Sequence, residues 1–159
     1  MADSMKTKGK KAPLTASDKT DWSKFDVKKQ GETMSKYELL TKYIPIFEDD
    51  YYGKLVGNSD QLPYVLYKNK LRDFEEDVFR FVDMHPEMDL RHYYSIIEKN
   101  GIDISEYDTA DISKVDATCI CALIVANLRA ERFCDGVIMY SCITGTFKRW
   151  LDRLKELDN

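Results

Sequence analysis

The chain of 159 residues is 43% hydrophobic and 12% aromatic, which is enough to build one buried core and argues against a disordered chain. With 33% charged residues, a mean hydropathy of -0.48 and no apolar run near the roughly 20 residues of a membrane helix, we expect a globular protein that makes no membrane contact. The first residues lack the apolar core of a signal peptide, so a cytoplasmic location is the default expectation.

The formal net charge of -4 is the sum of two unlike parts. Residues 1–29 contain eight lysines and four aspartates, an excess of +4, whereas the remaining residues carry 16 basic and 24 acidic side chains, or -8. We interpret residues 1–33 as a basic, flexible leader and residues 34–159 as an acidic domain. A solvated leader without a ligand is the simpler interpretation, and nucleic-acid binding is the alternative. The candidate nucleic-acid contacts are Lys6, Lys8, Lys10 and Lys11.

Apolar side chains recur with helical spacing directly after the leader. Tyr37, Leu40, Ile44 and Phe47 fall on one face of a helix, and Pro45 predicts a kink or break within it. The next segment is the least regular.

Residues 54–68 give a divided signal. The run Tyr64–Tyr67 has the composition of a strand, but Pro63 and the lack of a clear pairing partner favour a loop.

Three later helices are predicted from the same spacing. Their stripes are Leu71-Phe74-Val78-Phe81, then Leu90-Tyr93-Tyr94-Ile97, and finally Phe147-Trp150-Leu151-Leu154-Leu157. His85-Pro86 should end the first of them, because the residue before a proline is pushed out of helical geometry. Asn100-Gly101 is typical of a left-handed helix end.

One segment is apolar on all sides. Ser113 and Asp116 resemble a capping box, and residues 117–126 that follow carry no charge on any face. A helix of this kind belongs in the centre of a fold, with other helices around it. We therefore predict an all-α protein, a compact helical bundle around a buried central helix at about residues 113–133.

The sequence contains few residues or motifs that are typical of catalytic sites. His85 and His92 are the only histidines, and the phosphate-binding, dinucleotide-binding and hydrolase motifs are absent. Cys119 and Cys121 lie on opposite sides of a helix, so they cannot hold one metal ion together. Cys134 stands out among the four thiols, because Arg132 lies two positions before it and Asp135 directly after it, with opposite effects expected on its reactivity. We predict no catalytic residue, no metal site and no cofactor.

The most distinctive strings lie near the end of the chain: Arg129-Ala-Glu-Arg-Phe-Cys-Asp-Gly136 and Trp150-Leu-Asp-Arg-Leu-Lys155. They resemble a small bacterial domain family of unknown function over roughly residues 34–158. The resemblance implies a helical domain and a bacterial or mobile-element origin, and it carries no catalytic residue. From the spacing alone, we expect a polar patch, either as an ion-pair network or as a ligand site. Its residues are Arg129, Glu131, Arg132 and Asp135.

The leading hypothesis for function is a non-enzymatic protein-interaction module, a regulator or an inhibitor. Ten tyrosines support it, seven of them between Tyr51 and Tyr107 and interleaved with acids, because tyrosine is favoured at protein interfaces. The candidate partner-binding residues are Tyr51, Tyr52, Tyr64, Tyr67, Tyr107, Glu48, Asp49 and Asp50.

Two other classes stay open. One is direct nucleic-acid binding through the leader, or indirect contact through a nucleic-acid-binding partner. The other is an enzyme whose pocket is lined by Arg129, Arg132 and Cys134.

Overall fold

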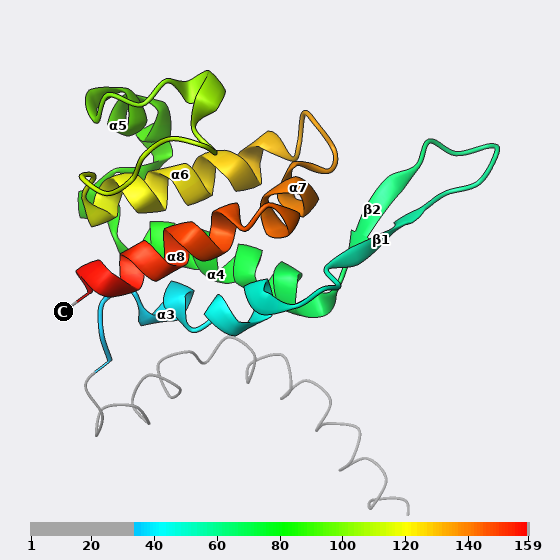
Figure 1. Cartoon of the computed structure of the whole chain (residues 1–159), viewed down its shortest axis with the longest axis horizontal. Coiled ribbons are helices and arrows are strands. Elements are labelled where there is room, and N and C mark those ends of the chain that lie inside the picture. The colour runs from blue at the N-terminus through cyan, green and yellow to red at the C-terminus, as the bar shows by residue number, and fades with distance from the viewer. Residues whose placement is uncertain (1–33, 159) are drawn as a thin grey trace, which may run out of the picture. The chain divides into compact units, whose positions relative to one another are not determined.

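The structure is a computed structural model in which residues 34–158 are described (Figure 1). The chain is divided after Met34, and the unit Ser35–Asn159 holds all the helices and strands given below. The predicted basic leader, residues 1–33, lies outside the described residues.

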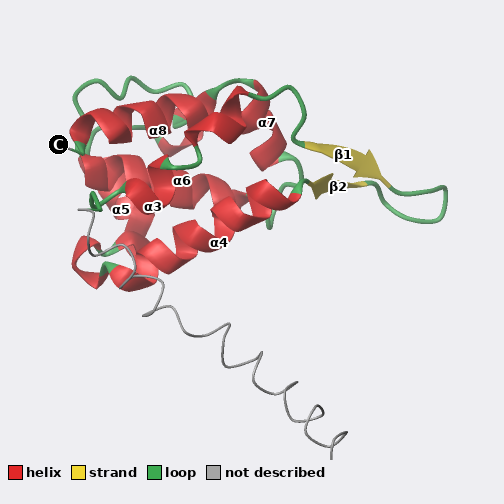
Figure 2. Ribbon diagram, turned by 90° about the horizontal axis from the view of Figure 1, so that it is seen from below, coloured by secondary structure: helices red, strands yellow, loops and turns green. Residues whose placement is uncertain are grey.

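Six α-helices and one two-stranded hairpin make up the regular structure of residues 34–158, with short 3-10 helices between them, as the all-α prediction required apart from the hairpin (Figure 2). In chain order the elements are α3 (Glu38–Thr41), β1 (Gly53–Val56), β2 (Tyr64–Tyr67), α4 (Asn69–Met84), α5 (Tyr93–Lys99), α6 (Ala117–Ala130), α7 (Val137–Ile143) and α8 (Thr146–Leu157).

The central helix is α6, and every side chain from Cys119 to Leu128 is buried. Helices α4, α5, α7 and α8 all pack against it, so the uniformly apolar segment lies at the centre, as predicted. The capping-box interpretation was wrong. Asp116 caps the helix by accepting the Cys119 N–H at 2.8 Å, whereas the Ser113 N–H is bonded to Asp111.

Helices α4 and α8 bury the apolar stripes that the sequence predicted. In α8 the side chains of Phe147, Trp150, Leu151 and Leu154 are completely buried. Phe74 of α4 meets Phe147 edge to face, with ring centroids 5.6 Å apart. These two amphipathic helices therefore cover α6 and place their charged faces in solvent.

Proline and glycine interrupt the chain where expected. Helix α3 ends at Thr41, and the chain continues as a 3-10 helix over Ile44–Glu48 with Pro45 in its first turn. Helix α4 ends at Met84, immediately before His85-Pro86. Gly101 has a φ of 78°, the left-handed conformation that closes α5.

The loop prediction for residues 54–68 was wrong, because the segment forms an antiparallel hairpin that projects from the bundle (Figures 1 and 2). Pro63 lies just before β2, where its missing N–H removes no bond from the ladder. Gly53 permits the strands to approach closely, since a Cβ there would lie 2.6 Å from the Leu66 carbonyl oxygen. Neither condition is visible without knowing which residues pair.

None of the described helices combines the length and the apolar character needed to cross a lipid bilayer.

Candidate functional site

The hairpin is fixed firmly at its base. Tyr52 is buried, and its ring stacks on Phe47 with centroids 6.5 Å apart. Lys68 Nζ lies over the Tyr52 ring, 5.4 Å from its centroid, and forms an ion pair with Asp49 at 2.7 Å. The Lys68 N–H also donates to Tyr52 O at 3.0 Å, which continues the ladder into the bundle. The strands therefore leave the bundle in a defined direction.

Glu131, at the end of α6, joins the hairpin to α7. Its carboxylate accepts hydrogen bonds from the N–H groups of Gly136 and Ile138 at 2.8 and 2.7 Å, and from the Tyr67 hydroxyl at 2.8 Å. Burial, and next the hydrogen bond to Glu131, raises the pKa of Tyr67 well above its usual range. The Tyr67 hydroxyl therefore stays protonated and donates, and the connection between α6, α7 and the hairpin is maintained.

The four residues of the predicted polar patch make contacts with two different parts of the structure. Asp135 accepts the Val65 N–H of β2 at 3.3 Å, so Glu131 and Asp135 both hold the hairpin. Arg129 instead lies over the Phe79 ring at 5.2 Å. Arg129 and Arg132 line a small depression on the α4 side of the molecule. The acids of the patch act on the hairpin, whereas its arginines face α4.

Beyond its base, the hairpin exposes apolar side chains on both faces. We call residues 51–67 the arm. Leu55 on β1 is 70% exposed and Leu62 in the turn is 89% exposed, so the described residues leave most of both side chains uncovered. The exposed large apolar side chains of the arm are Tyr51, Leu55, Leu62, Tyr64 and Leu66. Several exposed large apolar side chains on one projecting element are typical of an interaction site.

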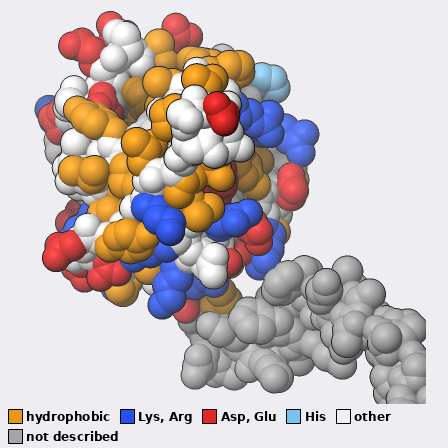
Figure 3. Space-filling model, turned by 90° about the vertical axis from the view of Figure 1, so that its right-hand side faces the viewer, with side chains coloured by type: hydrophobic (Ala, Val, Ile, Leu, Met, Phe, Trp, Pro, Cys, Tyr) orange, Lys and Arg blue, Asp and Glu red, His pale blue; other side chains and the backbone are white. Residues whose placement is uncertain are grey.

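The apolar surface extends onto the adjoining end of the bundle. The α6–α7 connector and α7 lie beside the base of the arm in both ribbon views (Figures 1 and 2). They add Phe133, which is 90% exposed, and also Tyr140 and Ile143. Viewed from this end, hydrophobic side chains are spread over the middle of the molecule (Figure 3).

The tyrosines predicted to bind a partner do not share one environment in the structure. Tyr51 and Tyr64 are exposed on the arm, whereas Tyr52 and Tyr67 hold its base. Tyr107 lies elsewhere, and its hydroxyl accepts from the Asn127 amide at 3.2 Å; burial raises its pKa to about 12.

The predicted acidic run Glu48–Asp50 lies immediately before the arm. Glu48 is 3.7 Å from Lys148, and Asp49 is paired with Lys68. Asp50 is exposed and forms no ion pair with a described residue.

Sequence reasoning missed the residues that dominate this surface, Leu55, Leu62, Leu66 and Phe133. A usable signal was present: two short β-prone runs separated by Gly57-Asn58 and Pro63 are typical of a hairpin. The turn confirms that signal, since Asn58 accepts the Asp60 N–H at 2.8 Å.

The pocket expected around Cys134 does not form as proposed. Cys134 is exposed and lines a cleft of about 470 Å³ together with Tyr107, Asn127 and Ser141. Neither arginine of the polar patch lines this cleft. Asn127 and Ser141 are buried, and the Asn127 amide donates to the Ser141 hydroxyl at 2.7 Å. The three groups of the enzyme hypothesis therefore do not share one site.

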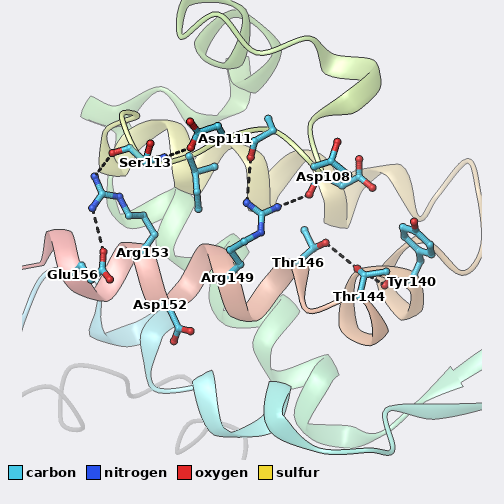
Figure 4. Close-up of a pocket in the computed structure, with 13 residues that line it drawn as sticks. Asp108, Asp111, Ser113, Tyr140, Thr144, Thr146, Arg149, Asp152, Arg153 and Glu156 are labelled. Carbon is cyan, nitrogen blue, oxygen red and sulfur yellow. Dashed lines mark hydrogen bonds and ion pairs between the residues drawn. The ribbon is translucent and has the colours of Figure 1, made fainter.

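A wider depression of about 740 Å³ lies between α8 and the loop before α6 (Figure 4). Arg149 donates to the Asp108 and Ala110 carbonyls at 2.5 and 3.2 Å, and Arg153 donates to the Ser113 carbonyl at 2.9 Å. The two arginines thus tie the loop to α8.

No three metal-ligating side chains converge within residues 34–158. The candidate nucleic-acid contacts Lys6, Lys8, Lys10 and Lys11 lie outside the described residues.

Comparison with known proteins gives one assignment. A family model described as "Family of unknown function (DUF6508)" matches residues 32–159, so the chain belongs to this family. No curated protein matches the chain. No solved structure matches it either.

Proposed function

We propose that this member of a family of unknown function is a protein-interaction module that docks on another protein through its arm. The observation that carries the proposal is the exposure of Leu55, Leu62 and Leu66 on a hairpin that is held rigidly at its base. A two-stranded hairpin is at best marginally stable alone, and leaving apolar side chains in water on both faces adds no stability. A partner that covers these side chains would account for the arrangement.

The energetics of the arm favour binding. Fully burying an exposed leucine contributes about 1.5 to 3 kcal/mol, and Leu55, Leu62 and Leu66 each retain part of this gain because they are 70%, 89% and 43% exposed. This gain is opposed by the cost of ordering the binding segment. The base contacts through Glu131 and Tyr52 have already removed much of that cost. A pre-ordered apolar arm therefore binds more tightly than the same sequence as a flexible loop.

The partner is expected to present an apolar surface bordered by basic groups. Residues 34–158 carry 23 acidic and 16 basic side chains, and 16 - 23 gives a net charge of -7. The exposed Asp50 and the run that contains it lie next to the arm. Opposite charge on the partner would speed association and fix its orientation. A module that occupies its partner's surface in this way acts as a regulator or inhibitor.

Photo-crosslinking tests the proposal. A photoreactive residue at Leu62, at the tip of the arm, is compared with one at Tyr94, which is also exposed, at 55% against 89% for Leu62, but lies on α5 at the other end of the bundle (Figure 1). In the native host, Leu62 should give one discrete adduct that Tyr94 does not give. The adduct's protein, once purified, should bind the Leu55→Ser Leu66→Ser variant at least about ten-fold more weakly.

Two results would contradict the proposal. One is that both positions give the same adducts, which is the pattern of random collision. The other is that the double substitution leaves the affinity unchanged. The fold of the variant is checked by its thermal unfolding, which should barely move because both side chains are exposed.

A further inference from the structure

The hydrogen bonds between β1 and β2 alternate along the ladder, and two contacts fix their phase. The Lys68 N–H donates to Tyr52 O at 3.0 Å, so this pair is hydrogen-bonded. Three pairs further along, the Val65 N–H points away from β1 and donates to Asp135 at 3.3 Å. Hydrogen-bonded and non-hydrogen-bonded pairs alternate along an antiparallel ladder, so the third pair after Tyr52–Lys68 must be of the second kind. The outward Val65 N–H agrees with this. The pair that Val65 forms with Leu55 is therefore not hydrogen-bonded.

This phase gives the two edges of the hairpin different surroundings. In β1, Gly53 and Leu55 stand at the positions that are not hydrogen-bonded, so the N–H and C=O groups of both point away from β2. None of the described residues forms a hydrogen bond with these outward groups. On β2 the corresponding outward N–H of Val65 is taken by Asp135. The edge of β2 is therefore occupied at one position, the Val65 N–H, whereas the edge of β1 is open at both Gly53 and Leu55.

We propose that the open edge of β1 accepts an extended segment of the partner protein as a third strand. This inference rests on the proposed function and specifies its mode. An open strand edge is a template for strand addition, in which backbone hydrogen bonds supply affinity and neighbouring side chains supply specificity. Here the outward groups of Gly53 and Leu55 form the template, and the exposed Leu55 side chain is the first specificity contact.

The chemistry around β1 defines the segment. An added strand places alternate side chains on the face of Leu55, so the segment needs apolar residues at alternate positions. One end passes the exposed Asp50, where a lysine or arginine is favoured. The domain of a second copy fits less well, because residues 34–158 carry 23 acidic and 16 basic side chains, a net charge of -7, so two such domains repel each other. The occupant is therefore an extended, apolar and basic segment of a different protein.

Two substitutions at one position separate backbone docking from side-chain docking. Leu55→Pro removes an outward N–H that the ladder does not use, so the hairpin should survive while the edge is blocked. Leu55→Thr removes most of the apolar side chain and keeps the N–H. Val56→Pro is the control for phase, because the Val56 N–H faces β2 and its loss should melt the arm.

The probe is a phage-displayed library of random linear peptides, selected on the full-length protein. We expect the selected peptides to alternate apolar residues and to carry Lys or Arg near one end. Leu55→Pro should weaken their binding at least about ten-fold more than Leu55→Thr does. In hydrogen exchange, the Gly53 and Leu55 amides should exchange rapidly in the free protein and at least about ten-fold more slowly with peptide bound. The inward amides of Lys54 and Val56 should be protected in both states.

Each other outcome overturns the inference. Equal loss with Leu55→Pro and Leu55→Thr, or no protection of the outward amides, would mean that the arm docks through side chains alone. Peptides that protect residues outside the arm, or a library that yields no binder, would show that β1 is not a strand acceptor. Concentration-dependent dimerisation that Leu55→Pro abolishes would assign the edge to a second copy. The crosslink from Leu62 would stand in the first of these cases, so failure of strand addition is distinguishable from failure of the proposed function.

Discussion

Helix α6 and the arm are both apolar segments, but α6 buries its side chains and the arm exposes them. Both are rich in aliphatic side chains, but those of α6 from Cys119 to Leu128 are all buried, whereas Leu55 and Leu62 of the arm are largely exposed. Four helices surround α6, and only the short contacts at its base hold the arm. Apolar content alone therefore does not distinguish a core from a binding surface. The distinction depends on what the rest of the chain places beside each segment.

The largest expected effect is on the core around α6. Trp150 of α8 is completely buried, and Trp150→Ala should lower the free energy of unfolding by about 3 to 5 kcal/mol, since it leaves a large cavity. Urea unfolding followed by circular dichroism measures the change. The matched control is Phe133→Ala, an aromatic truncation at an exposed position. Equal effects of the two substitutions would contradict the division into core and surface.

Alkaline pH tests the same core through its thiols. Burial raises the pKa of Cys119 to about 11 and that of Cys142 to about 12, from an ordinary value of 9.0. Above about pH 9 the unfolded chain loses these protons while the folded protein keeps them, so stability falls as pH rises towards the folded values. We expect a loss of about 1 kcal/mol per buried thiol at about pH 10.

Urea unfolding at several pH values measures this dependence. Cys142→Ala should make the fall of the unfolding free energy with pH less steep, because it removes one buried thiol. A free energy of unfolding that stays constant between about pH 8 and about pH 10 would contradict the burial of these thiols.

An effect smaller than that of Trp150→Ala is expected where the two regions meet. Glu131→Ala removes the acceptor of three hydrogen bonds and should cost about 2 to 3 kcal/mol. Hydrogen exchange should rise most in β2 and at the start of α7, where the lost donors lie. Glu131→Gln keeps one acceptor oxygen and should lose roughly half as much. Destabilisation that leaves exchange in β2 unchanged would show that Glu131 does not hold the arm.

The smallest expected effect is on the arm itself. Leu62→Ser should change the free energy of unfolding by less than about 0.5 kcal/mol, because the side chain is exposed and has little packing to lose. Thermal unfolding by scanning calorimetry measures it. A matched leucine in α6, Leu123→Ser, should destabilise the protein severely. If Leu62→Ser were also strongly destabilising, the tip of the arm would have to pack against the protein.

The sequence predicted the helices well because their signals are local. Stripes in α4 and α8 follow from residues three or four positions apart, and the uncharged run of α6 predicts burial on every side. The candidate surface was predicted less well. Tyr51 and Tyr52 are neighbours of the same type, yet one is exposed and the other stacks on Phe47. Composition cannot separate them, since the difference depends on which side of the chain faces the bundle.

By itself, the sequence determined that a helical domain surrounds one apolar helix. It also determined that the first 33 residues carry a net positive charge and the rest of the chain a net negative one. Only the tertiary structure decided that residues 53–67 pair as a hairpin and that one of its edges stays open. The deciding contacts join Tyr67 to Glu131 and Val65 to Asp135, which are 64 and 70 positions apart in the chain. Local periodicity carries no information about such pairs. They form because the helices, once packed, bring the end of α6 beside the strands.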